Sequence, residues 1–141
     1  MSATSTPAGY HSVTPSIIVR DASQAIDFYR RAFGAERLWQ IDDPAGVAGM
    51  SIDGARFFLA DENPPSTRSP ERVGCTTIRI ELFVDDPHAV YERAVAAGAQ
   101  PRNPVTEHTY ATIGTQSTLR MLQGSVVDPS GHIWLIGNFL E

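Results

Sequence analysis

The feature that most constrains the fold is an internal repeat of a strand, an aspartate and a helix. The first copy, at residues 13–35, reads VTPSIIVRDASQAIDFYRRAFGA, and the second, at residues 80–100, reads IELFVDDPHAVYERAVAAGAQ. In the first copy, Asp21 is placed to accept hydrogen bonds from the first N–H groups of the following helix. Apolar residues then recur at three- and four-residue spacing, which is typical of one face of a helix. A repeat at this period predicts a duplicated structural unit.

Each copy continues with patterns typical of strands. In the first half, Asp53-Gly54 predicts a tight hairpin between two apolar runs. In the second half, residues 128–131 (DPSG) predict a turn with proline in a favourable position. The predicted strands are 13–19, 36–41, 47–52 and 55–60 in the first half and 77–84, 101–107, 118–127 and 132–139 in the second. The predicted helices are 22–33 and 87–97, and Pro104 places its strand at a sheet edge.

The sequence therefore predicts one compact domain of the α+β class. It comprises a flexible leader (1–12), a first βαβββ module (13–62), a linker (63–76) and a second βαβββ module (77–141). The segment 108–117 is expected to be a loop. Two tandem βαβββ modules forming a curved mixed sheet would bury their helices on the convex side. A concave cleft between the halves is then the expected place for a small ligand.

Composition excludes several classes of function. The hydrophobic content of 42% supports a packed core, and the net charge of −5 comes without a cluster of basic residues. We therefore expect no nucleic-acid partner and no membrane surface partner. No apolar run approaches the length of a membrane span, and the N-terminus lacks the pattern of a signal peptide. Cys75 is the only cysteine, which excludes an intrachain disulfide and favours a cytoplasmic protein.

Four short motifs resemble those of the glyoxalase/bleomycin resistance/dioxygenase (vicinal oxygen chelate) superfamily, and the last three in sequence order resemble its PhnB-like branch. They are FYRRAFGA at 28–35, ADE at 60–62, AAGA at 96–99 and DPSGHIW at 128–134. The similarity extends from about Val13 to Phe139. It implies the tandem βαβββ fold and a homodimer, since members commonly dimerise. It does not select a function, because the fold hosts metalloenzymes and drug-binding resistance proteins alike.

The resemblance also implies where a metal would be held. Metal-using members place His or Glu on inward-facing positions of the opening and closing strands of each half, leaving positions where substrate oxygens bind. Counting from the repeat assigns these positions to Thr14, Phe58, Arg79 and Leu135, none of which forms a metal site. A gap of one or two residues in this count would instead place a site at Glu81 or His132. We therefore predict no cofactor. A divalent metal is expected only if the positions on these strands have been counted wrongly.

The strand at 77–84 alternates cleanly between apolar and other residues. Its apolar positions face the helices, while Arg79, Glu81 and Phe83 face the opposite, concave side. A charged pair there is costly unless it is used or paired. One interpretation is a ligand site in which Arg79 grips a carboxylate or phosphate. The other is an ion pair between Arg79 and Glu81 on a solvated face.

The remaining candidates each have a functional and a structural interpretation. His132 could be a ligand or an acid–base group, but the preferred expectation is a histidine packed beside Trp134. His108 and Tyr110 could act from a loop over the cleft or simply be exposed. Trp39 could belong to the core or to the cleft wall. The exposed positions His11 and His88, and the linker residue Cys75, carry little expectation of function.

The preferred prediction is metal-independent binding of a small, partly aromatic or anionic molecule in the concave cleft. The residues expected to line the cleft are Thr14, Ser16, Trp39, Phe58, Arg79, Glu81, Phe83, Tyr110 and Leu135. The alternative is a metal-dependent lyase, isomerase or dioxygenase of the glyoxalase type, using Glu81 with His132 or His108. A third possibility is a dimerisation or interaction module with no small ligand. Whether any reaction is catalysed stays open at this point.

Overall fold

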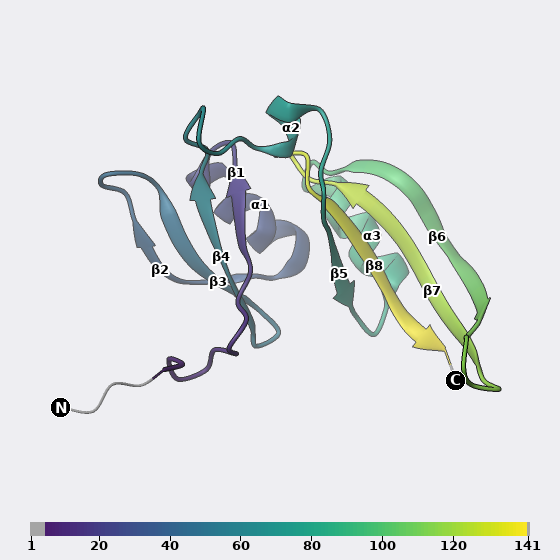
Figure 1. Cartoon of the computed structure of the whole chain (residues 1–141). Helices are drawn as coiled ribbons and strands as arrows, with labels where there is room; N and C mark the ends of the chain where they lie inside the picture. Colours follow the sequence, from purple (N-terminus) through teal and green to yellow (C-terminus); the bar gives the residue numbers. More distant parts are fainter. Residues whose placement is uncertain (1–4, 141) are drawn as a thin grey trace.

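The computed structural model describes residues 5–140, so residues 1–4 of the predicted leader and Glu141 lie outside the described residues. Figure 1 shows two halves side by side, each a sheet with its long helix packed on one face. Each half has the order βαβββ, and each contains one four-stranded mixed sheet. The predicted fold class is thereby confirmed. No helix among residues 5–140 is long and apolar enough to cross a membrane.

The first half is built on strand β1, which lies at the inner edge of its sheet. The strand order is β1-β4-β3-β2, and β1 runs parallel to β4 while the other pairs are antiparallel. Helix α1 begins where the Asp21 side chain accepts from the Gln24 N–H at 2.9 Å, and it ends at Gly34 with φ 67°. The elements are β1 (Ser16–Val19), α1 (Ala22–Phe33), β2 (Glu36–Ile41), β3 (Val47–Ile52) and β4 (Ala55–Asp61).

The segment between the halves contains a short helix that the sequence analysis did not predict. Helix α2 (Pro70–Val73) is capped by Ser69, whose side chain accepts from the Arg72 N–H at 3.4 Å. Pro70 fits the first helical position because its missing N–H would have no intrahelical partner there. Glu62 anchors the helix, since its carboxylate pairs with Arg72 and accepts from the Ser69 N–H.

The second half repeats the first with longer strands. Its order is β5-β8-β7-β6, with β5 parallel to β8. The prediction of a loop from residue 108 is wrong for residues 108–111, because pairing with β7 continues the strand to Ala111. The prediction that Pro104 lies in an edge strand is confirmed, and the register of β6 shifts beside it. The elements are β5 (Arg79–Phe83), α3 (Pro87–Ala96), β6 (Gln100–Ala111), β7 (Thr118–Val127) and β8 (Ile133–Leu140).

One aromatic core joins the two halves. Trp134 of β8 lies 5.3 Å from Tyr29 and 4.6 Å from Phe33, measured between ring centroids. The Tyr29 hydroxyl donates to the Asp128 carboxylate at 2.5 Å, and the Trp134 indole donates to the same oxygen at 3.0 Å. Helices α1 and α3 also pack on each other. The halves therefore form one domain, although their sheets are separate.

The turn after β7 closes the inner edge of β1. The carbonyls of Pro15 and Val19 accept hydrogen bonds from the β4 side, so the carbonyl of Ile18 points to the free edge. There it accepts from His132 Nε2 at 2.6 Å, and the next free N–H, of Arg20, donates to Ser130 Oγ at 3.1 Å. The turn 128–132 thus satisfies backbone groups that an edge strand would otherwise leave unpaired.

Candidate functional site

Strand β5 carries its charged residues on the face away from the helices. Arg79, Glu81 and Phe83 are exposed, while Ile80 and Leu82 pack against the core. In register, Arg79 pairs with Ile133, and Glu81 pairs with Leu135 of β8. Among residues 5–140, the ion pairs do not include one between Arg79 and Glu81. The Glu81 carboxylate instead accepts from Gln123 Nε2 at 3.3 Å.

A cavity of about 400 Å³ lies on this face of the second sheet. It brings together three of the predicted residues, Arg79, Tyr110 and Leu135, and adds Arg102, which the sequence analysis did not single out. Within the described chain, its lining contains two arginines and neither Asp nor Glu. Its volume lies within the range of roughly 300–1,000 Å³ that is usual for ligand pockets. The arrangement suits a small anion.

Hydrogen bonds hold the polar groups around this cavity. Arg102 Nη1 donates to the buried Ser125 Oγ at 3.2 Å, which keeps the guanidinium against β7. His108 Nε2 lies 3.2 Å from Thr106 Oγ1 and 3.3 Å from the Gln123 carbonyl oxygen. The cavity therefore has a fixed polar floor.

The His108 and Tyr110 rings form an aromatic wall beside the arginines. Their centroids lie 6.2 Å apart, and their planes differ by 2°. Both residues line the cavity, and Tyr110 is 52% exposed. An anion that also carried a flat ring would find both a charge partner and a stacking surface here.

The first sheet contributes an aromatic cluster of its own. Trp39 of β2 lies 5.5 Å from Phe58 of β4, between ring centroids, and packs over Gly49, whose lack of a side chain leaves room for the indole. Tyr10 covers this pair, because its ring lies 5.5 Å from Phe58 and its hydroxyl accepts from Trp39 Nε1 at 3.3 Å. Trp39 is therefore part of the sheet surface and not of the core.

The other predicted residues are dispersed. Ser16 pairs in register with Phe58, while Thr14 is half-buried and its hydroxyl donates to the His11 carbonyl at 3.1 Å. Phe83 lies beyond the cavity and stacks on Phe139 at 5.2 Å. The residues predicted to line one cleft are therefore separated. Trp39 and Phe58 lie on the first sheet, Arg79, Tyr110 and Leu135 line the cavity on the second sheet, and Phe83 lies at another groove.

His132 has the packed position that was preferred for it. The ring is buried, and its Nε2 is used by the Ile18 carbonyl, while Nδ1 has no partner among the described residues. Within residues 5–140, no three His, Cys, Asp or Glu side chains are grouped so that they could hold a metal ion. Metal independence itself stays a prediction.

Asp128 is a buried polar centre, although the sequence pattern around it indicates only a turn. One oxygen accepts from Tyr29 and Trp134, and the other accepts from the N–H groups of Ser130 and His132. Burial, and then the neighbouring Asp128 charge, raise the pKa of Tyr29 well above its ordinary value of 10.0. Tyr29 therefore remains a hydrogen-bond donor, and the motif DPSGHIW serves to join the halves.

Comparisons with known proteins identify the family. The sequence model of the Glyoxalase/Bleomycin resistance protein/Dioxygenase superfamily matches residues 9–136, and the chain belongs to this superfamily. It is similar to the uncharacterized protein Rv0887c of Mycobacterium tuberculosis H37Rv, with 32% identity over 133 residues. That match covers 89% of this chain and 73% of the relative.

Solved structures show the same fold at lower identity. TioX from Micromonospora sp. ML1 matches with a TM-score of 0.64 and 22% identity over 91% of this chain and 98% of its own. A glyoxalase/bleomycin resistance protein/dioxygenase from Alicyclobacillus acidocaldarius gives 0.65 and 16%, covering 92% and 91%. The fosfomycin resistance protein FosX from Listeria monocytogenes gives 0.59 and 16%, covering 89% and 90%. At these identities the likeness concerns the fold alone.

Proposed function

We propose that the protein binds a small anionic molecule with an aromatic part on its concave face, without a metal. The observation that carries this proposal is the cavity lined by Arg79 and Arg102 beside the stacked His108 and Tyr110 rings. Two guanidinium groups facing one cavity favour a carboxylate or phosphate. The exposed aromatic rings favour a flat apolar body.

Two copies of the chain would complete the cleft. Each sheet offers one wall, and the apolar residues Val13, Ile41 and Ile78 are exposed by 86%, 50% and 53%. Exposed apolar surface beside sheet edges favours association. We therefore infer a homodimer, which light scattering of the purified protein tests directly. If the protein is a monomer at all concentrations, a second copy cannot supply a wall of the cleft, and this part of the proposal is wrong.

Two further assignments belong to the same proposal. A place in the PhnB-like branch rests on the motifs at residues 60–62, 96–99 and 128–134. A cytoplasmic location rests on the single cysteine, Cys75. One cysteine cannot form an intrachain disulfide, which is the feature that an oxidising compartment would favour.

The proposal is tested with naphthalene-2-carboxylate as the probe and naphthalene-2-carboxamide as its neutral counterpart, by calorimetry on the full chain. We expect the carboxylate to bind more tightly than the amide. Arg79→Gln and Arg102→Gln should each lower its affinity about tenfold, as expected for loss of a charged partner. Arg37→Gln, on exposed β2, is the control and should leave the affinity unchanged.

Metal dependence is tested in the same experiment. Binding that survives EDTA treatment supports the metal-independent proposal. Loss of binding with EDTA, restored by one divalent ion, would instead support the glyoxalase-type enzyme. Equal affinity of the wild-type protein and both arginine variants would contradict the assigned cavity.

A further inference from the structure

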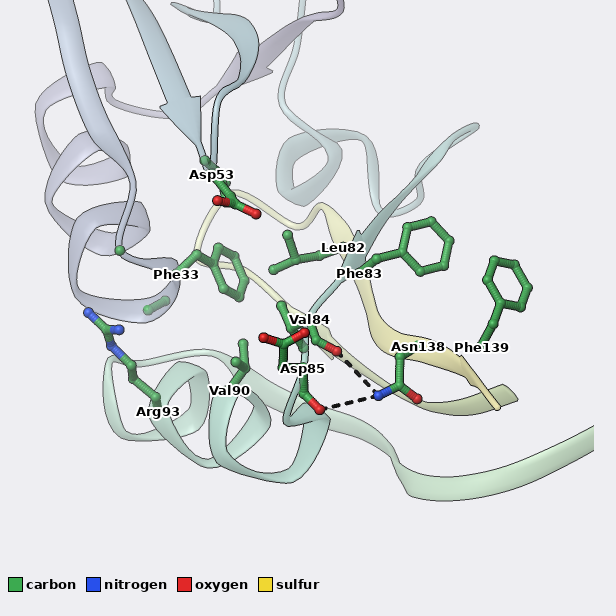
Figure 2. Close-up of a pocket in the computed structure, with 13 residues that line it drawn as sticks. Phe33, Asp53, Leu82, Phe83, Val84, Asp85, Val90, Arg93, Asn138 and Phe139 are labelled. Atoms are coloured by element: carbon green, nitrogen blue, oxygen red, sulfur yellow. Dashed lines mark hydrogen bonds between the residues drawn. The ribbon is translucent and has the colours of Figure 1, made fainter. Parts of the chain in front are cut away.

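A second and larger groove lies between the halves, away from the arginine-lined cavity. Its volume is about 670 Å³, which is sufficient for a small organic molecule. The β3–β4 turn, the end of α1, strand β5 and helix α3 surround it, and Figure 2 shows its side chains. Its apolar walls include Phe33, Leu82, Val84 and Val90.

The groove lies beside the free edge of β5. At the equivalent edge in the first half, that of β1, a turn of the chain fills the corresponding space. In the repeat, Val84 corresponds to Val19, so Phe83 on the free edge of β5 corresponds to Ile18 on the free edge of β1. At β1 the turn 128–132 reaches across and bonds to that edge. The matching β3–β4 turn consists only of Asp53 and Gly54, and it leaves the groove open beside β5.

Acidic side chains outnumber basic ones in the groove, with two aspartates and one arginine. Asp53 and Asp85 come from opposite walls, and Figure 2 shows both carboxylates directed toward the space between them. In the part of the chain that the structure describes, neither carboxylate forms an ion pair. The groove's arginine, Arg93, is engaged elsewhere, since it donates to the Arg31 carbonyl at 2.6 Å and the Arg30 carbonyl at 3.3 Å.

Asn138 at the wall of the groove has an amide oxygen without a partner. The Asn138 side-chain nitrogen donates to the carbonyls of Val84 and Asp85, each at 3.3 Å, which fixes the orientation of the amide. Its Oδ1 is buried and has no hydrogen-bond partner among the described residues. Because this oxygen is buried, a ligand in the groove does not contact it, and the amide serves to hold the end of β5 through its nitrogen.

Aromatic surface completes the groove. Phe83 and Phe139 stack on each other and are 52% and 54% exposed, so their faces can receive an apolar or cationic group. Carboxylates on two walls and exposed rings both favour a donor-bearing cation. We propose that this groove binds a small organic ammonium or amidinium ion that carries a flat apolar body.

The probe for this site is 2-naphthylmethylamine, which has the ring system of the anionic probe but the opposite charge. Amide NMR spectra of the ¹⁵N-labelled full chain will locate binding. We expect shifts at the Asn138 side-chain amide and at the backbone of Phe83 and Gly34, with millimolar or tighter affinity. The neutral 2-naphthylmethanol should bind more weakly at these signals.

A double variant tests the charge directly. Asp53→Asn with Asp85→Asn should lower the affinity for the amine at least tenfold, about 1.4 kcal/mol. Asp43→Asn, at the other end of strand β3, is the matched control and should bind as the wild-type protein does.

Four outcomes would overturn the proposal. They are no binding of the amine, shifts confined to other residues, equal affinity in the double variant, and equal binding of the neutral alcohol. Shifts at Phe83 and Asn138 that depend on protein concentration without any probe would assign the groove to a second copy of the chain. Because the two probes share a ring and map to different residues, failure here is distinguishable from failure at the Arg79 cavity.

Discussion

Nε2 of His132 lies 2.6 Å from the carbonyl oxygen of Ile18, across 114 positions of sequence. His132→Ala would leave this carbonyl without its donor and remove a buried ring. Loss of a partner for a buried polar group costs about 1–3 kcal/mol, so we expect a loss of that size in the free energy of unfolding. Urea denaturation measures it. His88→Ala, at an exposed helical position, should change stability by less than about 0.5 kcal/mol.

The Tyr29 hydroxyl supports the buried Asp128 carboxylate. Tyr29→Phe keeps the ring but removes the donor, and hydrogen bonds to charged groups contribute about 1.5–3 kcal/mol. We expect destabilisation of that order in thermal and urea unfolding. Tyr91→Phe is the control, since the Tyr91 ring packs partly against the same core and its hydroxyl has no hydrogen bond among residues 5–140. Equal effects of the two changes would show that Tyr29 acts only by packing.

The Glu62–Arg72 pair predicts a component of acid sensitivity. The hydrogen bond from Arg72, followed by that from the Ser69 N–H, lowers the pKa of Glu62 from 4.5 to about 2. A carboxylate with a lowered pKa in the folded state stabilises the protein above its unfolded-state value, and this contribution is lost as pH falls. The difference in stability between the wild-type protein and Glu62→Gln should therefore shrink between pH 4.5 and about 2. A difference that is constant across this range would contradict the pairing.

Gly49 makes room for the Trp39 indole. Gly49→Ala would place a methyl group where the ring now lies, and the indole must move away from Phe58 and Tyr10. We expect a large shift of the Trp39 indole N–H signal in amide NMR spectra, with the Trp134 signal unchanged. Ser51→Ala, on the same strand and face, should leave both signals in place. Because Trp39 is only 37% exposed, its displacement uncovers apolar surface, and the loss of stability should be about 1–3 kcal/mol.

Local signals in the sequence were sufficient for most elements. Helix α1 occupies the predicted residues 22–33 because both of its ends carry capping residues, Asp21 and Gly34. Helix α2 was missed because four residues give no periodicity, and only the Ser69-Pro70 pair could have indicated it. The extension of β6 to Ala111 depends on pairing with β7, which no local pattern shows.

The candidate sites could be predicted only in part. Alternation along 79–83 places Arg79 on the open face, because side chains of a strand alternate between faces. Arg102 follows Pro101 in a strand whose register shifts, so its position in the cavity has no periodic signal. The role of Asp128 depends on Tyr29, which is 99 positions away and is brought near only by the packing of the halves.

The unequal turns of the two halves record how the repeat has diverged. An ancestor with two identical units would have closed both inner strand edges or neither, by symmetry. In the present chain the residues Ser130 and His132 lock one edge, and Asp53-Gly54 stops short of the other. One such set of hydrogen bonds between a turn and a strand edge is sufficient to hold the two halves of the chain together. The turn at the other edge is therefore not required to reach across, and a short turn there is compatible with a stable chain.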